Sequence, residues 1–213
     1  MPGLSADPER RRIREAFLEL VAEHGYGATT LPALLERAGV DHAAFQRRYA
    51  DLDRCFADIW EDYKAEFLRV TGEAFENGTG WLEGMRAAAW AFCRFLQRDR
   101  ARARFFLVEL NFAGEEVRAS RDVVMDRYAD LIDRCNDGRS DGSRVPRAQA
   151  EAIVGAIWEA AVTRVVADEF DAFPEAIPQG MYLTVFPYLG LEAAQEELRR
   201  GPEDIVRYLR GEL

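Results

Sequence analysis

The chain has 213 residues, of which 48% are hydrophobic and 31% are charged. This balance excludes a chain that is disordered throughout, and the length is sufficient for a buried core. A net charge of −10 excludes a surface that attracts nucleic acid everywhere. Residues 1–50 have no net charge, because they contain seven basic and seven acidic residues. Any DNA-binding face is therefore expected at the N-terminus.

Three cysteines, Cys55, Cys93 and Cys135, are far apart and form no CxxC pair. They indicate neither a disulfide framework nor a zinc site, and His, Asp and Glu residues show no metal-ligand spacing. The N-terminus lacks the apolar core of a signal peptide, and no uncharged apolar run is long enough to span a membrane. We therefore expect a cytoplasmic protein without metal, cofactor or membrane contact.

Apolar residues recur at steps of three and four in nearly every segment, which predicts an all-α fold. Asp7 is a plausible N-cap before Pro8, and Gly25 ends the first helix. The buried stripe of this helix is expected to contain Ile13, Phe17, Leu20 and Val21.

Two short helices should follow. Thr30 is suited to cap the second helix, and Gly39 is suited to the turn after it. Asp41 is suited to cap a third helix that runs through Arg48, with Ala44 and Phe45 facing inward. Asp51 is suited to cap a long fourth helix.

Helices are also expected in most of the remaining chain. A loose arm is predicted at residues 2–7, and Gly, Ser and Asp predict a surface loop at residues 136–146. Near the C-terminus, residues 177–189 predict a helix kinked near Pro187 and Gly190, and residues 198–209 predict a final helix.

A helix of about eight residues, a glycine turn and a second short helix form the spacing of a helix-turn-helix unit. In this arrangement base edges would face His42, Ala43, Gln46 and Arg47. Phosphate oxygens would be held by Thr29, Thr30 and Arg48. From periodicity alone, a packed three-helix bundle without DNA contacts is an equally good interpretation.

The string EAFLELVAEHGYGATTLPALLERAGVDHAAFQRRYADLDRCF strongly resembles the N-terminal domain of TetR/AcrR-family transcriptional regulators, over about residues 9–60. Gly25 and Tyr26, then Thr29 and Thr30, match the order and spacing of that family. The resemblance implies a DNA-binding domain at residues 1–51, followed by a larger helical ligand-binding and dimerisation domain at 52–213.

The chain departs from the family at two positions. Gln46 stands where the family usually has a phosphate-contacting tyrosine, and Leu52 stands where a lysine commonly opens the fourth helix. Both departures remove expected contacts with the DNA backbone. The arginines between Arg10 and Arg14 are candidates to compensate.

The family resemblance also implies an inducer pocket in the second domain. An apolar pocket is expected to include Trp81, Met85, Trp90, Phe92, Phe105, Phe106, Tyr128 and Trp158, with Glu109 as its polar member. Each of these aromatic residues could equally belong to an ordinary core. Glu109 could equally reach solvent.

The implied assembly is a homodimer formed by helices near residues 147–170 and 176–198. The main hypothesis is a repressor that leaves a near-palindromic operator when a small apolar or aromatic effector binds. The alternative is a helical ligand-binding or protein-interaction dimer whose helix-turn-helix no longer binds an operator. No enzyme motif is present, so catalysis is not expected apart from a minor hypothesis centred on Glu109.

Overall fold

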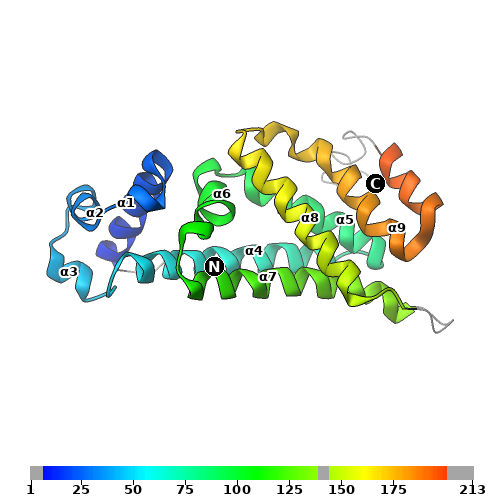
Figure 1. Cartoon of the computed structure of the whole chain (residues 1–213), viewed down its shortest axis with the longest axis horizontal. Coiled ribbons are helices and arrows are strands. Elements are labelled where there is room, and N and C mark those ends of the chain that lie inside the picture. Colours follow the sequence, from blue (N-terminus) through cyan, green and yellow to red (C-terminus); the bar gives the residue numbers. More distant parts are fainter. Residues whose placement is uncertain (1–6, 139–143, 201–213) are drawn as a thin grey trace. The chain divides into compact units, whose positions relative to one another are not determined.

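The computed structural model describes residues 7–138 and 144–200, and within these ranges every regular element is a helix (Figure 1). The all-α prediction is confirmed. The predicted N-terminal arm, part of the predicted loop at residues 136–146 and nearly all of the predicted final helix lie outside the described residues. No helix within the described ranges is long and apolar enough to cross a membrane.

The chain divides into two compact units, which we call the N-terminal unit and the C-terminal unit. The N-terminal unit continues to Ala65 and resumes from Asp99 to Arg121. The C-terminal unit contains Glu66–Arg98 and the described part of the chain from Asp122 onward. Packing therefore groups residues 99–121 with the predicted DNA-binding region. The predicted functional division at residues 51 and 52 remains a prediction.

The N-terminal unit begins with α1 (Pro8–His24), η1 (Tyr26–Ala28), α2 (Leu31–Ala38) and α3 (His42–Gln46). It also includes the first part of α4 (Leu52–Glu76), then α6 (Arg100–Leu107), η2 (Glu109–Phe112) and the start of α7 (Glu115–Asp133). α1 packs against both α2 and α6. The predicted stripe on α1 is confirmed, since Ile13, Phe17, Leu20 and Val21 are all buried.

Local capping explains where the N-terminal helices begin. The side chain of Asp7 accepts the N–H groups of Glu9 and Arg10, and Pro8 occupies the first position of α1. Thr30 accepts the N–H of Ala33 at 3.4 Å. Asp51 accepts the N–H of Arg54 at 2.8 Å. These three predicted caps are confirmed.

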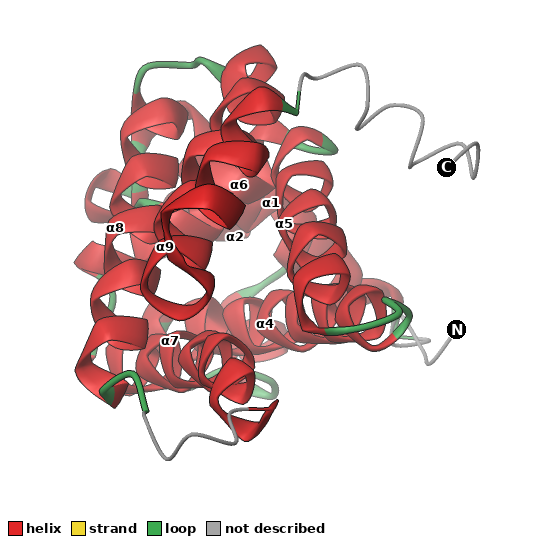
Figure 2. Ribbon diagram, turned by 90° about the vertical axis from the view of Figure 1, so that its right-hand side faces the viewer, coloured by secondary structure: helices red, strands yellow, loops and turns green. Residues whose placement is uncertain are grey.

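The C-terminal unit contains α5 (Trp81–Gln97), η3 (Arg134–Gly138), α8 (Arg147–Val166), η4 (Phe170–Ala172) and α9 (Phe173–Arg199), with the remaining parts of α4 and α7. α9 packs against both α5 and α8, and Figure 2 shows it between them. Gly190 has a φ of 84° and interrupts the helical backbone of α9, so the predicted kink is confirmed.

A close backbone approach fixes the turn between α4 and α5. A Cβ atom added to Gly78 would lie 2.3 Å from the backbone nitrogen of Gly84. A Cβ atom added to Gly84 would lie 2.7 Å from the carbonyl oxygen of Phe75. Because both distances are far below van der Waals contact, only glycine fits at these two positions without a backbone shift.

Candidate DNA-binding surface and ligand cavity

The turn between α2 and α3 is built on Gly39. Its φ of 61° and ψ of 42° lie in the left-handed region, which glycine adopts without steric cost. Asp41 then caps α3 by accepting the N–H of Ala44 at 2.6 Å. The two short helices and the turn therefore have the predicted helix-turn-helix form.

Two inward side chains fix the orientation of α3. Ala44 is 3% exposed and Phe45 is fully buried. The ring centroids of Phe45 and Tyr49 lie 5.6 Å apart, and the Tyr49 hydroxyl donates to Asp58 at 2.9 Å. The opposite face of the helix is exposed and carries His42, Ala43 and Gln46, followed by Arg47. These are the four residues that the sequence predicts to face base edges.

α3 is shorter than predicted. It ends at Gln46 rather than at Arg48, because the N–H of Arg48 bonds to the carbonyl of Phe45 at 2.9 Å in a turn. Arg48 is consequently half-buried, whereas Arg47 stays exposed.

The two predicted phosphate-binding threonines differ in their surroundings. Thr30 is exposed and, besides capping α2, retains its hydroxyl proton for an external acceptor. Thr29 is 8% exposed, and its hydroxyl donates to the carbonyl of Gly25 at 2.9 Å. The geometry therefore favours Thr30 over Thr29 as a phosphate ligand.

Arg10 and Arg14, predicted candidates for compensating phosphate contacts, are bound to carboxylates of α4. Arg10 Nη2 lies 2.7 and 2.8 Å from the two carboxylate oxygens of Asp58. Arg14 pairs with Asp58 at 2.9 Å and with Asp62 at 2.8 Å. Burial of Asp58 opposes ionisation, but hydrogen bonds from Arg10 and Tyr49 outweigh it and hold the pKa of this carboxyl below its ordinary value.

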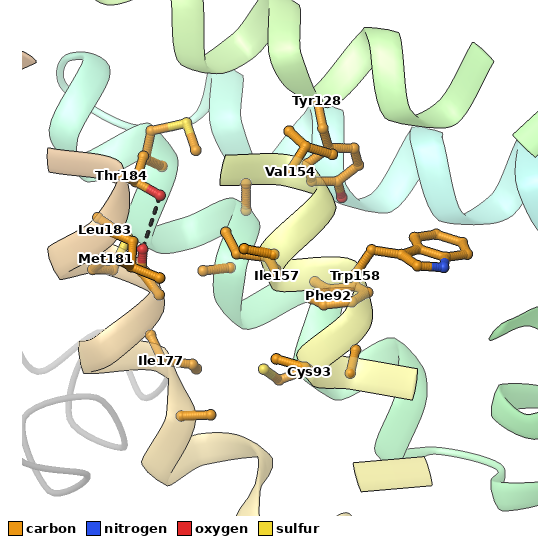
Figure 3. Close-up of a pocket in the computed structure, with 18 of the residues that line it drawn as sticks. Phe92, Cys93, Tyr128, Val154, Ile157, Trp158, Ile177, Met181, Leu183 and Thr184 are labelled. Atoms are coloured by element: carbon orange, nitrogen blue, oxygen red, sulfur yellow. Dashed lines mark hydrogen bonds between the residues drawn. The ribbon is translucent and has the colours of Figure 1, made fainter. Parts of the chain in front are cut away.

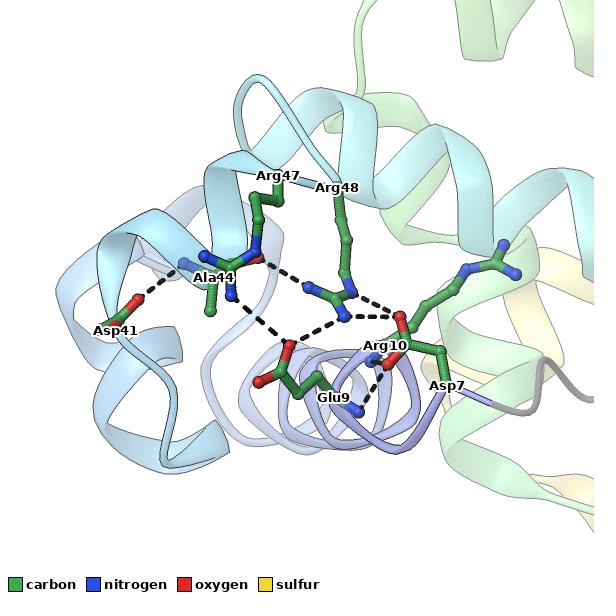
Figure 4. A network of polar contacts seen from close by, with 7 residues as sticks. All are labelled: Asp7, Glu9, Arg10, Asp41, Ala44, Arg47 and Arg48. Carbon is green, nitrogen blue, oxygen red and sulfur yellow. Dashed lines mark hydrogen bonds and ion pairs between the residues drawn. The ribbon is translucent and has the colours of Figure 1, made fainter.

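Arg48 is also bound within the protein (Figure 4). Its Nη2 atom lies 2.6 Å from Asp7 Oδ2 and 2.8 Å from Glu9 Oε2. Arg47 approaches the same carboxylate of Glu9 at 3.8 Å. Both arginines after α3 thus face acidic side chains at the start of α1.

Glu109 is a buried carboxylate in η2, and its exposed fraction is only 2%. Its Oε2 accepts the backbone N–H of Tyr26 at 2.8 Å, and its Oε1 lies 3.3 Å from Arg104 Nε. The hydroxyl of Tyr26 donates to Asp53. Glu109 therefore satisfies a backbone donor in η1, a role that its position in the sequence FFLVELNF did not indicate.

The rings of Phe105 and Phe106 belong to the core of the N-terminal unit. Phe105 stacks on Phe56 with ring centroids 4.3 Å apart, and Phe106 stacks on Trp60 at 5.3 Å. Phe105, Phe106 and Glu109, which the sequence predicts as pocket residues, do not line the cavity described next. They are already packed against or hydrogen-bonded to residues of α1, η1 and α4.

A cavity of about 180 Å³ lies within the C-terminal unit, between side chains of α4, α5, α7, α8 and α9 (Figure 3). Its lining is almost entirely apolar, and Arg164 is the only charged residue among the described residues that form it. The Thr184 hydroxyl is occupied, since it donates to the carbonyl of Gly180 at 2.9 Å. Burial raises the pKa of the Cys93 thiol to about 12, so this lining group stays neutral at physiological pH.

Four of the nine predicted pocket residues line this cavity: Met85, Phe92, Tyr128 and Trp158. Trp81 and Trp90 do not. The indole nitrogen of Trp81 donates to the carbonyl of Leu131 at 2.9 Å, and Trp90 is buried in α5 outside the lining. The aliphatic part of the lining was missed, including Ile157, Ile177, Met181 and Leu183. These residues come from α8 and α9.

Among residues 7–138 and 144–200, no group of three His, Cys, Asp or Glu side chains is placed to hold a metal ion.

Part of the N-terminal unit matches a known protein family. Residues 13–59 match the family described as bacterial regulatory proteins, tetR family. No match is found among curated protein sequences.

The fold is shared with solved structures. The fatty acid degradation regulator FadR from Bacillus halodurans has a TM-score of 0.73 and 15% identity, over 88% of this chain and 98% of that chain. FadR from Bacillus subtilis, in complex with stearoyl-CoA, has a TM-score of 0.67 and 18% identity, over 85% and 98%. A regulatory protein of the tetR family from Rhodococcus RHA1 has a TM-score of 0.67 and 18% identity, over 84% and 98%.

The helix-turn-helix geometry and the larger helical unit form the architecture of these solved regulators. Residues 13–59 thus match the tetR family of bacterial regulatory proteins, and the described fold is the one seen in solved regulators of that family.

Replacing Glu109 tests its role in the N-terminal unit. Glu109→Ala removes the acceptor of the Tyr26 N–H and leaves a buried donor without a partner. We expect the free energy of unfolding to fall by about 2–3 kcal/mol. Glu109→Gln is the matched control, because its amide oxygen can still accept this hydrogen bond. Urea denaturation measures both variants, and an alanine variant as stable as the glutamine variant would contradict the assigned role.

Proposed function

We propose that this regulator binds operator DNA by placing α3 in the major groove. The observation that supports this proposal most strongly is the way α3 packs against the rest of the N-terminal unit. The buried residues Ala44 and Phe45 hold one face, while His42, Ala43, Gln46 and Arg47 remain exposed on the other. Helix-turn-helix proteins read base edges with a short helix of this kind, in which one face is buried against the domain and the opposite face is exposed.

The exposed side chains suggest how bases would be read. Gln46 has the donor and acceptor needed for adenine, and Arg47 has the paired donors needed for guanine. Thr30 and Arg48 are the proposed phosphate ligands. Because Leu52 stands where the family commonly has a lysine, one charged contact with the DNA backbone is missing, and we propose an affinity with a shallow dependence on salt.

We also propose a two-fold homodimer through the outer faces of α8 and α9. α9 exposes large apolar side chains, and the exposed fractions of Leu183, Phe186 and Leu191 are 47%, 47% and 52%. α8 exposes the small residues Ala156 and Ala160, which permit close helix approach. A dimer would present two copies of α3 about one turn of DNA apart, roughly 34 Å, and would select a near-palindromic operator in the cytoplasm.

The proposed effector is a small apolar or aromatic molecule that occupies the cavity of the C-terminal unit. The apolar lining supports this chemistry. FadR from Bacillus subtilis, which shares the fold, was solved in complex with stearoyl-CoA. We propose repression that is relieved when the effector favours a dimer geometry with the wrong spacing of α3. The response can be no larger than the difference between the effector's affinities for the two geometries.

Binding to the promoter beside the protein's own gene tests DNA recognition. Competition binding over a range of salt concentrations should show a preference for this duplex over random duplex. Arg47→Ala should lower discrimination at one base pair by about 1–3 kcal/mol, because the bidentate contact to guanine is lost. Binding to random duplex should change little.

Arg69→Ala is the matched control for charge. Arg69 is an exposed arginine of the C-terminal unit, where it pairs with Glu73 at 2.8 Å. This variant should retain full discrimination. If the wild-type protein shows no preference for the promoter at any salt concentration, the alternative stands: a ligand-binding or protein-interaction dimer whose helix-turn-helix does not bind an operator.

Filling the cavity tests the effector site. Ile157→Trp adds volume to a half-buried lining residue and should weaken binding of the apolar fluorophore 1-anilinonaphthalene-8-sulfonate at least tenfold. Fluorescence titration measures the affinity, and a melting curve verifies that the variant folds. Val123→Trp is the control, because Val123 is 49% exposed and lies next to the lining residue Val124 without lining the cavity. Equal affinity in the wild type and Ile157→Trp would refute the assignment of this cavity.

A further inference from the structure

Each nitrogen of the Arg48 guanidinium contacts an oxygen of the N-terminal unit (Figure 4). Nε donates to Asp7 Oδ2 at 2.7 Å, and Nη2 lies near both Asp7 and Glu9. Nη1 donates to the carbonyl of Ala44 at 3.0 Å. All three nitrogens thus have an oxygen partner, so a DNA phosphate must compete for this side chain.

The two carboxylates resemble a bound phosphate in their chemistry. Both phosphate and carboxylate offer anionic oxygens that pair with the planar fork of arginine. Arg48 receives two such oxygens, from Asp7 and Glu9, at 2.6 and 2.8 Å. Arg47 adds a weaker approach to Glu9 at 3.8 Å. Two positive charges after α3 are therefore balanced locally by two negative charges.

Asp7 is held in place independently of Arg48. Its Oδ1 accepts the N–H groups of Glu9 at 3.0 Å and Arg10 at 3.4 Å, as the N-cap of α1, while Oδ2 faces Arg48. The helix N-terminus also favours the ionised carboxylate. The hydrogen bond from Arg48 further holds the pKa of Asp7 below its ordinary value, so the negative charge persists at neutral pH.

We propose that Asp7 and Glu9 act as an internal phosphate mimic that competes with the DNA backbone for Arg48 and lowers operator affinity. The proposal depends on the proposed binding of DNA by this surface. The opposing possibility is that the two carboxylates only position Arg48 for phosphate. The two roles predict opposite changes in DNA affinity when the carboxylates are removed. Removing a competitor strengthens DNA binding, whereas removing a positioning contact weakens it.

The variants Asp7→Asn and Glu9→Gln test the mimic in the full chain. Asparagine caps helices as well as aspartate does, so Asp7→Asn removes the charge but retains the cap. Fluorescence anisotropy with the promoter duplex gives the Kd at several salt concentrations. The double variant should bind about tenfold more tightly. Its plot of log affinity against log salt should steepen by about 0.9, the value for one additional phosphate contact.

Two further variants separate the proposal from a general charge effect. Asp130→Asn removes an acidic partner of Arg147, 2.7 Å away in the C-terminal unit, and should leave the Kd unchanged. Adding Arg48→Ala to the double variant should abolish the gain, because the gain requires a released Arg48.

Each outcome supports or overturns the mimic. Tighter, Arg48-dependent binding by the double variant supports it, including the case in which only the variant binds detectably. If the wild type binds the promoter and the double variant binds equally or more weakly, the mimic is wrong while DNA recognition stands. A gain that survives Arg48→Ala also overturns it. If neither protein prefers the promoter, both the mimic and the proposed function fail.

Discussion

The N-terminal unit depends on one buried carboxylate. Glu109 accepts the backbone N–H of Tyr26 at 2.8 Å, although the two residues are 83 positions apart. A buried carboxylate without partners would be strongly unfavourable, and a buried N–H without an acceptor would add to the cost. The ring of Tyr26 then lies against Phe17 and Phe56, at centroid distances of 6.0 and 4.8 Å. The helix-turn-helix is therefore completed by residues 99–121, well beyond the match to the family at residues 13–59.

The arginines of the same unit differ in their surroundings: some are ion-paired within the unit, and others are largely exposed. Arg10 and Arg14 are held by carboxylates of α4, and Arg48 is held by carboxylates at the start of α1. Arg47 keeps most of its side chain exposed, at 60%. Several of the basic side chains in residues 1–50 are thus neutralised by specific ion pairs with carboxylates. Because these arginines are already paired, the electrostatic attraction of this surface for DNA would be modest. Base contacts would then carry a larger share of recognition than in a strongly basic protein.

Local features could be predicted from the sequence, whereas the partners of long-range contacts could not. The caps at Asp7, Thr30, Asp41 and Asp51, and the left-handed turn at Gly39, depend on residues within one helical turn. The site in the C-terminal unit was predicted only in part. An aromatic residue that lines a cavity and one that fills a core give the same periodicity, so Phe92 could not be distinguished from Phe105. The sequence predicts Glu109 as the polar member of the pocket, because its actual partner Tyr26 lies too far away in sequence to be inferred.

Amide hydrogen exchange at Tyr26 in the intact protein tests the central role of Glu109 most directly. A hydrogen bond to a buried carboxylate should protect this N–H to the level of buried amides in α1, such as that of Phe17, because both would require the opening of the unit. Exchange of the Tyr26 amide as fast as that of the exposed neighbour Gly27 would contradict this account. It would mean that residues 99–121 do not secure the helix-turn-helix.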